Sequence, residues 1–227
     1  MAQHPNLTVI DHPLVRHKLG ILRARDTPVT LFRELVDEIT SLLVYDLTKD
    51  LAEEEIEVET PLERVTAHRL RGKKAVVVPV LRAGLGMVDG VLRVIPSARV
   101  GHIGLARDEI SLRPGQYYFK VPARLDERPV IVVDPMLATG GSATAALDGL
   151  KARGAIALRF ACIVAAPEGV EALERAHPDV PVFAAALDRQ LNDVGFILPG
   201  LGDAGDRLYG TKDDDEPRGG TAAQGVE

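Results

Sequence analysis

Four short, uninterrupted apolar segments constrain the fold of this 227-residue chain more than any other feature. They are rich in Val and Ala and are separated by longer stretches of mixed composition: KKAVVVPV (73–80), RPVIVVD (128–134), ALRFACIVAA (157–166) and VPVFAAAL (180–187). A strand with one solvent-facing side alternates apolar and polar residues, whereas a strand buried on both faces is apolar throughout. The four segments therefore predict the central strands of a mainly parallel sheet that is covered on both faces.

Amphipathic stretches before and between these segments are predicted to be the covering helices. The clearest one has Thr27 as its N-cap and Pro28 in its first turn. It continues with apolar side chains at helical spacing, namely Leu31, Leu35, Ile39 and Leu42. Further helices are expected over residues 14–25, 86–95, 142–153 and 167–176. The alternation of strand and helix predicts a doubly wound α/β domain.

Three segments depart from this alternation. EEEIEVET (53–60) is expected to form a strand or a solvated edge, and RDEISLRPGQYYFKVP (107–122) a hairpin or lid inserted in the sheet. DDDEPRGGTAAQGVE (213–227) has the composition of a disordered acidic tail. Because no linker divides the remainder, a single domain is expected over residues 1–212.

Composition excludes several classes of protein. The net charge is −6, and residues 1–212 carry only −2 of it, so nucleic acid is not an expected partner. The single cysteine, Cys162, excludes a disulfide framework, and its apolar surroundings predict a buried, inert thiol. No apolar run approaches the roughly 20 residues that span a bilayer, and the N-terminus has no signal-like core. No membrane contact and a cytoplasmic location are expected.

The segment from Val130 to Leu147, VIVVDPMLATGGSATAAL, has the features of an anion site. A predicted strand ends at Asp134, and a short loop rich in glycine and hydroxyl groups leads into a helix. Ligands bind at the carboxyl ends of strands in open α/β sheets, and the N-terminus of a helix suits a phosphate group. The alternative is a plain strand–helix turn in which Ser142 caps the helix. We favour the phosphate hypothesis.

Two other glycine-rich segments also follow predicted strands. In Val76 to Val91, VVVPVLRAGLGMVDGV, Arg82 is expected to donate hydrogen bonds to an anion, which we favour over the alternative of a solvated turn residue. Gly195 to Lys212, GFILPGLGDAGDRLYGTK, interleaves glycine with apolar residues, which is typical of an ordered loop that offers main-chain hydrogen bonds to a flat ligand. It contains a Gly-x-Gly-x-x-Gly match at Gly200, but no βαβ unit follows, so NAD is not expected.

These segments resemble the uracil phosphoribosyltransferase family among the type I phosphoribosyltransferases. VDPMLATGGS (133–142) is similar to the signature for phosphoribosyl diphosphate (PRPP), in the form that has Pro135 in place of a second acid. VPVLRAGLGMVDGV (78–91) and LPGLGDAGDRLYGTK (198–212) resemble the pyrophosphate and uracil loops of the family, and the likeness runs from about His12 to Lys212. Two departures are a lid segment that begins Arg107-Asp108-Glu109, where Arg-Asn-Glu is expected, and the acidic tail.

The resemblance implies a type I phosphoribosyltransferase fold with an inserted lid or hairpin and a base-binding hood. The implied reaction converts uracil and PRPP to uridine monophosphate (UMP) and diphosphate. Asp134 would contact the ribose hydroxyls, residues 138–142 the 5′-phosphate, and Arg82 and Arg107 the pyrophosphate. The full set expected to bind PRPP is Arg82, Arg107, Asp134, Pro135, Met136, Leu137, Ala138, Thr139, Gly140, Gly141, Ser142 and Asp203. The set expected to bind uracil is Ile197, Gly202, Asp203 and Ala204.

The resemblance also implies partners for the chain. Mg²⁺ is expected to be held through PRPP and water with no direct protein ligand, GTP to be an allosteric activator, and the protein to be a homo-oligomer. No residue is assigned as a dedicated general acid or base. Two alternatives are a non-catalytic regulator that senses PRPP or a nucleotide, and a purine or orotate transferase. The body charge argues against the first and the segment 195–212 against the second.

Overall fold

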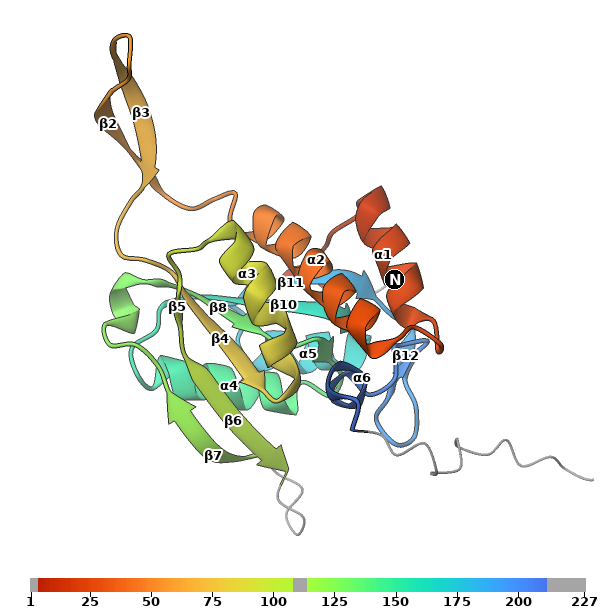
Figure 1. The fold of residues 1–227 in the computed structure, drawn as a ribbon. Coiled ribbons are helices and arrows are strands. Elements are labelled where there is room, and N and C mark those ends of the chain that lie inside the picture. Colours follow the sequence, from red (N-terminus) through yellow and green to blue (C-terminus); the bar gives the residue numbers. More distant parts are fainter. Residues whose placement is uncertain (1–3, 108–113, 212–227) are drawn as a thin grey trace, which may run out of the picture.

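The computed structural model describes residues 4–107 and 114–211. Within them a mixed, mainly parallel sheet runs through the middle of the molecule (Figure 1). In spatial order its main strands are β1 (Leu7–Val9), β11 (Val182–Leu187), β10 (Ala157–Ala165), β8 (Pro129–Val133), β4 (Val76–Leu81), β6 (His102–Arg107) and β7 (Pro114–Lys120). Two short strands, β5 (Arg99–Val100) and β9 (Met136–Leu137), pair with β4 and β10. Every pair is parallel except β6 with β7.

The four apolar segments of the sequence are the four central strands, β11, β10, β8 and β4, which confirms the prediction. Alternate residues of each strand enter two separate hydrophobic clusters, one on each face of the sheet. In β4, for example, Val77 packs on one face while Val76 and Val78 pack on the other, and all three are fully buried. Burial on both faces explains why these strands carry no alternation of polar residues.

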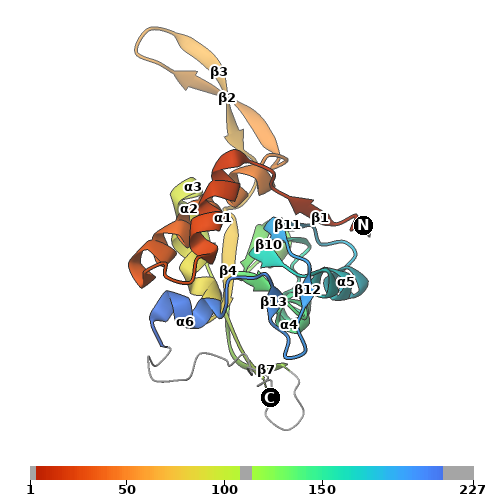
Figure 2. The same ribbon diagram turned by 90° about the vertical axis from the view of Figure 1, so that its right-hand side faces the viewer.

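Two layers of helices cover the sheet, as Figure 2 shows. One face is covered by α1 (Pro13–Arg23), α2 (Val29–Leu47), α3 (Val88–Val94) and α6 (Ala204–Tyr209), and the other by α4 (Gly141–Lys151) and α5 (Pro167–Ala176). This is the predicted doubly wound architecture. Among the described residues, no helix is both long and apolar enough to cross a bilayer.

Two helix starts differ from the predictions. Pro28, not Thr27, is the N-cap residue of α2, because Thr27 turns its hydroxyl group back to donate to the carbonyl of Ile21 at 2.5 Å. The single helix predicted over 86–95 is a 3-10 helix, η1 (Ala83–Met87), followed by α3. Gly84 allows this tight approach: a Cβ atom at Gly84 would lie 2.5 Å from the carbonyl oxygen of Val133.

Two antiparallel hairpins extend from the α/β core. The first, β2 (Glu53–Glu59) with β3 (Arg64–Leu70), projects well away from the sheet (Figures 1 and 2), and it is the predicted strand of residues 53–60 with a partner. The second, β6 with β7, ends one edge of the sheet and corresponds to the expected insertion. Residues 108–113 of the predicted lid segment, the domain boundary at residue 212 and the tail 213–227 lie outside the described residues.

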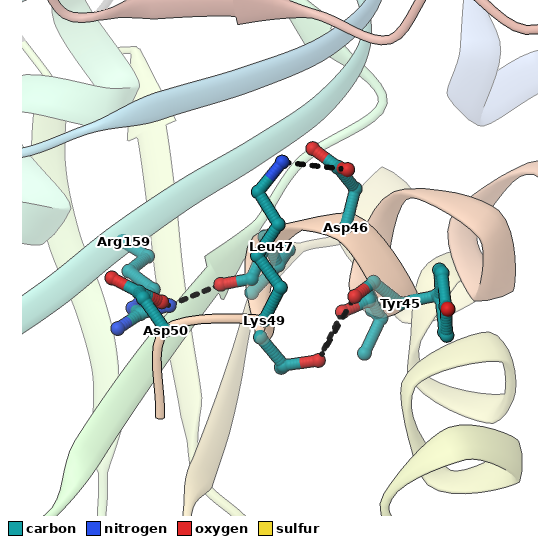
Figure 3. Close-up of polar contacts among 8 residues, drawn as sticks. Tyr45, Asp46, Leu47, Lys49, Asp50 and Arg159 are labelled. Atoms are coloured by element: carbon teal, nitrogen blue, oxygen red, sulfur yellow. Dashed lines mark hydrogen bonds and ion pairs between the residues drawn. The ribbon is translucent and has the colours of Figure 1, made fainter. Parts of the chain in front are cut away.

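Arg159 on β10 fixes the C-terminal end of α2, at the edge of the sheet where β10 begins (Figure 3). Its guanidinium group donates to the carbonyl of Leu47 and also pairs with Asp50. Next to it, Lys49 pairs with Asp46 at 3.0 Å on the outside of the helix. The arginine therefore holds a main-chain carbonyl and a carboxylate together.

Candidate active site

The predicted site residues lie at the carboxyl ends of neighbouring parallel strands. Arg82 directly follows β4, and Asp134 directly follows β8. These two strands pair, with Pro79 opposite Val133, so both residues leave the sheet at the same edge. This is the edge at which open α/β sheets bind ligands.

The loop before α4 begins the helix without a capping side chain. The N-cap residue is Gly140, with a left-handed φ of 80°, and no side chain accepts a hydrogen bond from the first turn. The alternative in which Ser142 caps a plain turn is therefore wrong, and Ser142 and Thr139 are both exposed. The first turn of α4 keeps N–H groups available for an anion.

The two central glycines of this loop have different roles. A Cβ atom at Gly140 would lie 2.9 Å from the carbonyl oxygen of Gly169 on α5, so the packing of the loop requires glycine there. A Cβ atom at Gly141 would meet only the hydroxyl oxygen of Thr139, at 3.8 Å. The space beside Gly141 is thus open, as it must be if an anion is to approach the main chain.

The main chain of residues 135–137 is hydrogen-bonded to strand β10 of the sheet. The carbonyl of Pro135 accepts hydrogen bonds from Ile163 and Val164 at 3.0 and 3.1 Å, and the carbonyl of Leu137 accepts one from Ala166 at 2.9 Å. Met136 and Leu137 form β9 against β10, and the Leu137 side chain is buried. These residues position the loop, and Ala138, partly buried, follows them into the exposed turn.

The carboxyl group of Asp134 is partly buried where β8 ends. Burial raises its pKa from 3.8 to about 7, although the N–H of Met136, 3.5 Å from Oδ1, acts in the opposite direction. A carboxylate in this position has few protein donors, so hydroxyl donors from a ligand would stabilise its charged form.

Arg82 presents its guanidinium group to solvent while its main chain is held. Its carbonyl accepts hydrogen bonds from Leu85 N–H at 3.1 Å and from the hydroxyl group of Tyr209 at 3.0 Å. Among the residues described, Arg82 has no ion-pair partner, so its charge is available to an anion. Arg107 ends β6, the strand beside β4, and thus reaches the same edge of the sheet.

The segment from Gly195 onward is an ordered loop, as predicted. Ile197 is buried in β13 (Ile197–Leu198), which pairs with β12 (Gln190–Leu191). Gly202 has a φ of 77°, and Ala204 is buried at the start of α6. Asp203 is exposed and accepts a hydrogen bond from Asp206 N–H at 2.9 Å, which makes it the N-cap of α6. The glycine pattern here precedes a six-residue helix and not a βαβ unit.

Contacts between the three glycine-rich segments bring them to one place. A Cβ atom at Gly195 would lie 3.9 Å from Cγ2 of Thr139, which places the third segment beside the first. A Cβ atom at Gly86 would lie 2.7 Å from the side chain of Leu208, which places the second segment against α6. The expected sites for phosphate, pyrophosphate and base therefore surround one region.

Sequence reasoning missed three residues that shape this region. Arg23 and Asp188 form an ion pair behind the third segment, and Tyr209 contacts the second. Asp188 carried a usable signal, because it directly follows β11, as Asp134 follows β8. Nothing in the sequence marks Arg23 or Tyr209 as partners of residues more than a hundred positions away.

Metal-binding and nucleophilic side chains are scarce at this edge. The described part of the chain contains no group of three or more His, Cys, Asp or Glu side chains that could hold a metal ion by themselves. Cys162 is fully buried in β10, and burial, together with the nearby charge of Asp134, raises the pKa of its thiol. A buried thiol with a raised pKa is unreactive, which confirms the predicted inert thiol.

Comparison with known proteins identifies the family. The sequence model described as uracil phosphoribosyltransferase matches residues 9–211. Uracil phosphoribosyltransferase of Geobacillus kaustophilus is 58% identical over 204 residues, covering 90% of this chain and 98% of the relative. The enzyme of the same name in Listeria innocua is 59% identical over 207 residues, covering 91% and 99%.

Solved structures agree on the fold. The AQ2163 protein of Aquifex aeolicus has a TM-score of 0.85 and 38% identity, with coverage of 90% of this chain and 98% of that protein. An adenine phosphoribosyltransferase of Trypanosoma brucei, with a TM-score of 0.54, 17% identity and coverage of 88% and 89%, shares the fold. The family model and the curated relatives show that the chain belongs to the uracil phosphoribosyltransferase family.

Proposed function

We propose that this protein transfers the 5-phosphoribosyl group of PRPP to uracil, forming UMP and diphosphate in pyrimidine salvage. The observation that carries the proposal is the meeting of three glycine-rich segments, from residues 82, 134 and 195 onward, at the carboxyl edge of one sheet. Family membership supplies the identity of the substrates, which the fold alone would not.

The proposed roles follow from the chemistry of each group. The uncapped start of α4 and the hydroxyl groups of Thr139 and Ser142 would hold the 5′-phosphate. Asp134 would accept hydrogen bonds from the ribose hydroxyls, and Arg82 and Arg107 would bind the pyrophosphate. Residues 135–137 would set the loop in place through their bonds to β10.

In the reaction the bond from ribose C1 to the diphosphate oxygen breaks, and a bond from C1 to uracil N1 forms, with loss of the N1 proton. Negative charge grows on the departing diphosphate, and the arginine side chains stabilise it. Holding the two substrates in line supplies most of the remaining rate, because little covalent chemistry is left to side chains. We assign no residue as a general acid or base.

Mg²⁺ is the proposed cofactor. It prefers oxygen ligands and usually binds through substrate phosphates, several waters and one or two carboxylates. Asp134 and Asp203 are the carboxylates of the expected site, and they would act on the ion through PRPP and water and not as direct ligands. The ion would neutralise charge on the leaving diphosphate.

Uracil would be recognised by main-chain groups of Ile197 and residues 202–204. Within the described part of the chain, the N–H groups of Gly202 and Ala204 have no hydrogen-bond acceptor. Uracil offers two carbonyl acceptors and an N3–H donor, so free main-chain groups of both kinds can read it. Asp203 would contribute to PRPP or to the water shell of Mg²⁺ through the oxygen that does not cap α6.

We also propose that the protein is a homo-oligomer. The β2–β3 hairpin stands off the body with exposed apolar side chains, including Leu62 and Leu70, and two-stranded hairpins are marginally stable alone. A second copy packed against it would stabilise it. Light scattering should give a mass that is a multiple of the 24.4 kDa chain, and a monomer would contradict this proposal.

Activation by GTP and a cytoplasmic location complete the proposal, and both rest on the family resemblance. Turnover at limiting PRPP, measured with and without GTP, tests the first. Expression in its own cell as a fluorescent fusion tests the second.

The activity itself is tested by UMP formation from PRPP with a panel of bases. Uracil should be converted in the presence of magnesium and not in the presence of excess chelator. Orotate and hypoxanthine should not be converted. Conversion of a purine or of orotate in preference to uracil would contradict the proposed function.

A further inference from the structure

A buried ion pair holds the main chain of the base-binding segment at Gly200. Arg23, the last residue of α1, pairs with Asp188 through both of its terminal nitrogens, at 2.8 and 2.5 Å. The same Arg23 Nη1 donates to the carbonyl of Gly200 at 2.6 Å, and Asp188 Oδ2 accepts from the N–H of Gly200 at 2.9 Å. The pair thus holds both main-chain groups of a single residue.

The environment of this pair makes its geometry specific. The side chain of Asp188 is only 5% exposed and that of Arg23 is 21% exposed. A buried carboxylate requires a partner and satisfied hydrogen bonds, and the planar guanidinium fork can supply two parallel bonds to it. Lysine carries the same charge but cannot bind the carboxylate and the Gly200 carbonyl together in this geometry.

Gly200 lies in a tight turn that leaves no space for a side chain. Its φ is 61°, and a Cβ atom on it would lie 2.1 Å from the carbonyl oxygen of Ile197. The turn therefore folds directly onto Ile197, one of the residues expected to read the base. A shift of Gly200 must move Ile197 on one side and Gly202 on the other.

A second arginine ties the next residue to the same helix end. Arg207 donates to the carbonyl of Leu201 at 2.9 Å and to the carbonyl of Ala24, the C-cap of α1, at 2.5 Å. Its guanidinium group also lies 4.3 Å from the centre of the Phe32 ring on α2. The end of α1 is thus joined to the loop at two successive residues.

We propose that Arg23 and Asp188 are positioning residues that set the affinity and selectivity for the base without touching it. Their bonds occupy the main-chain groups of Gly200, whereas the N–H groups of Gly202 and Ala204 have no acceptor in the described part of the chain and are free for uracil. This inference rests on the proposed function. It predicts a loss mainly for the base, because the proposed PRPP contacts at Asp134, Arg82 and the start of α4 lie outside this pair, and only Asp203 belongs to the loop that the pair holds.

The decisive variant is Arg23→Lys, with Arg159→Lys as its matched control. Arg159 also holds a main-chain carbonyl and a carboxylate (Figure 3). It does so near the start of β10, whereas the candidate site lies at the carboxyl ends of the strands. Displacement of reacting groups by about 1 Å can reduce a rate roughly 100-fold. We expect kcat/KM for uracil to fall at least tenfold in Arg23→Lys, mainly through KM, and to stay within twofold in Arg159→Lys.

The remaining measurements separate positioning from general stability. Equilibrium binding of PRPP in the absence of uracil should stay within twofold of wild type in both variants, and thermal unfolding measures the loss of stability in each variant separately. Use of cytosine relative to uracil should rise in Arg23→Lys alone. An unchanged KM for uracil, or equal losses for uracil and PRPP, would overturn the proposal.

A double variant and the activity of the wild-type protein complete the experiment. If a single variant does not fold, the double variant Arg23→Met, Asp188→Leu removes both charges and leaves neither buried alone. It should fold and still show the loss for uracil, and a normal KM for uracil there would overturn the proposal. If the wild-type protein forms no UMP at all, the proposed function fails first, which the wild-type arm reveals by itself.

Discussion

The hydroxyl group of Tyr209 donates a hydrogen bond to the main-chain carbonyl of Arg82 over 3.0 Å. This bond joins the last helix of the described chain to the loop expected to hold pyrophosphate. Burial raises the pKa of Tyr209, while the positive charges of Arg33 and Arg82 lower it, with burial the larger effect. The hydroxyl group therefore stays protonated and able to donate throughout the neutral pH range.

Tyr209→Phe removes only this hydroxyl group. Because a net hydrogen bond contributes about 1 kcal/mol, we expect a small loss of stability and a several-fold fall in kcat/KM for PRPP, caused by a less ordered Arg82 loop. Tyr45→Phe is the control, since Tyr45 is exposed on α2 away from the site. Steady-state kinetics and thermal unfolding check both variants, and equal kinetics in the two would contradict the role of Tyr209.

Arg82→Ala removes a donor that we propose to act on charge developing in the transition state. Loss of one such donor typically costs roughly 10²–10³ in turnover. The variant should fold normally, because the Arg82 side chain is exposed and only its carbonyl has described bonds. Arg175→Ala on α5 provides an exposed arginine for comparison. Activity of Arg82→Ala within a few-fold of wild type would show that Arg82 is only a solvated turn residue.

Asp134→Asn should make the protein more stable while it weakens PRPP binding. Because the folded pKa is raised to about 7 from 3.8, the folded state binds more protons than the unfolded state between these values. The contribution of Asp134 to stability therefore falls as pH rises from about 4 to 7, and the cost persists at higher pH. The asparagine variant escapes this cost, so its advantage should grow from pH 5 to pH 8.

Thermal unfolding at several pH values measures this effect. A pKa difference of one unit corresponds to about 1.4 kcal/mol, so a gain of several degrees in melting temperature is expected at pH 8. An advantage that does not change with pH would contradict the assigned cause. If the Asp134→Asn variant bound PRPP with the affinity of the wild type, Asp134 would not contribute to PRPP binding.

Gly141→Val should abolish PRPP binding without loss of the fold. A side chain at this position enters open space in the structure, and that space is where the 5′-phosphate is expected. Gly20→Val on α1 is a control, because a Cβ atom at Gly20 meets nothing within 4 Å, while one at Gly141 meets only the hydroxyl oxygen of Thr139, at 3.8 Å. Calorimetry with PRPP distinguishes the two variants. Normal binding of PRPP by Gly141→Val would show that the 5′-phosphate does not bind beside Gly141.

Local pattern in the sequence predicted the central strands, the helices between them and the three loops, because each of these depends on residues close together in the chain. The apolar run at 128–134, for example, determines both β8 and the place where Asp134 leaves it. Pairings between distant segments left no such pattern. The antiparallel partner of β2, the strand β1 beside β11 and the contact of Arg23 with Asp188 all join residues without a local signal.

The separate roles of the site residues could be assigned only from the structure. The sequence marked Gly140 and Gly141 as a pair, but only the packing against α5 separates the glycine that the fold requires from the one that leaves space. In the same way, the sequence suggested Ser142 as a possible cap, and the left-handed φ of Gly140 assigns that position to the glycine.

Selectivity for uracil over cytosine follows from recognition of the base by main-chain groups. Cytosine replaces the O4 acceptor of uracil with an amino donor and its N3–H donor with an acceptor, so main-chain groups matched to uracil would face cytosine unpaired. Each buried unpaired group costs about 1–3 kcal/mol, and sites built on hydrogen bonds can reject a wrong pattern by roughly 10⁴–10⁵. A small halogen at C5 leaves all three polar atoms of uracil in place. Ile197→Leu should barely change the preference, because the groups proposed to bind the base belong to the main chain.

The measurement is the steady-state rate of nucleotide formation from PRPP with uracil, 5-fluorouracil and cytosine, in the wild-type protein. Turnover of uracil and of 5-fluorouracil should be comparable, and turnover of cytosine should not be measurable. Turnover of cytosine within a hundredfold of that of uracil would contradict recognition of the base by the main chain of residues 197–204.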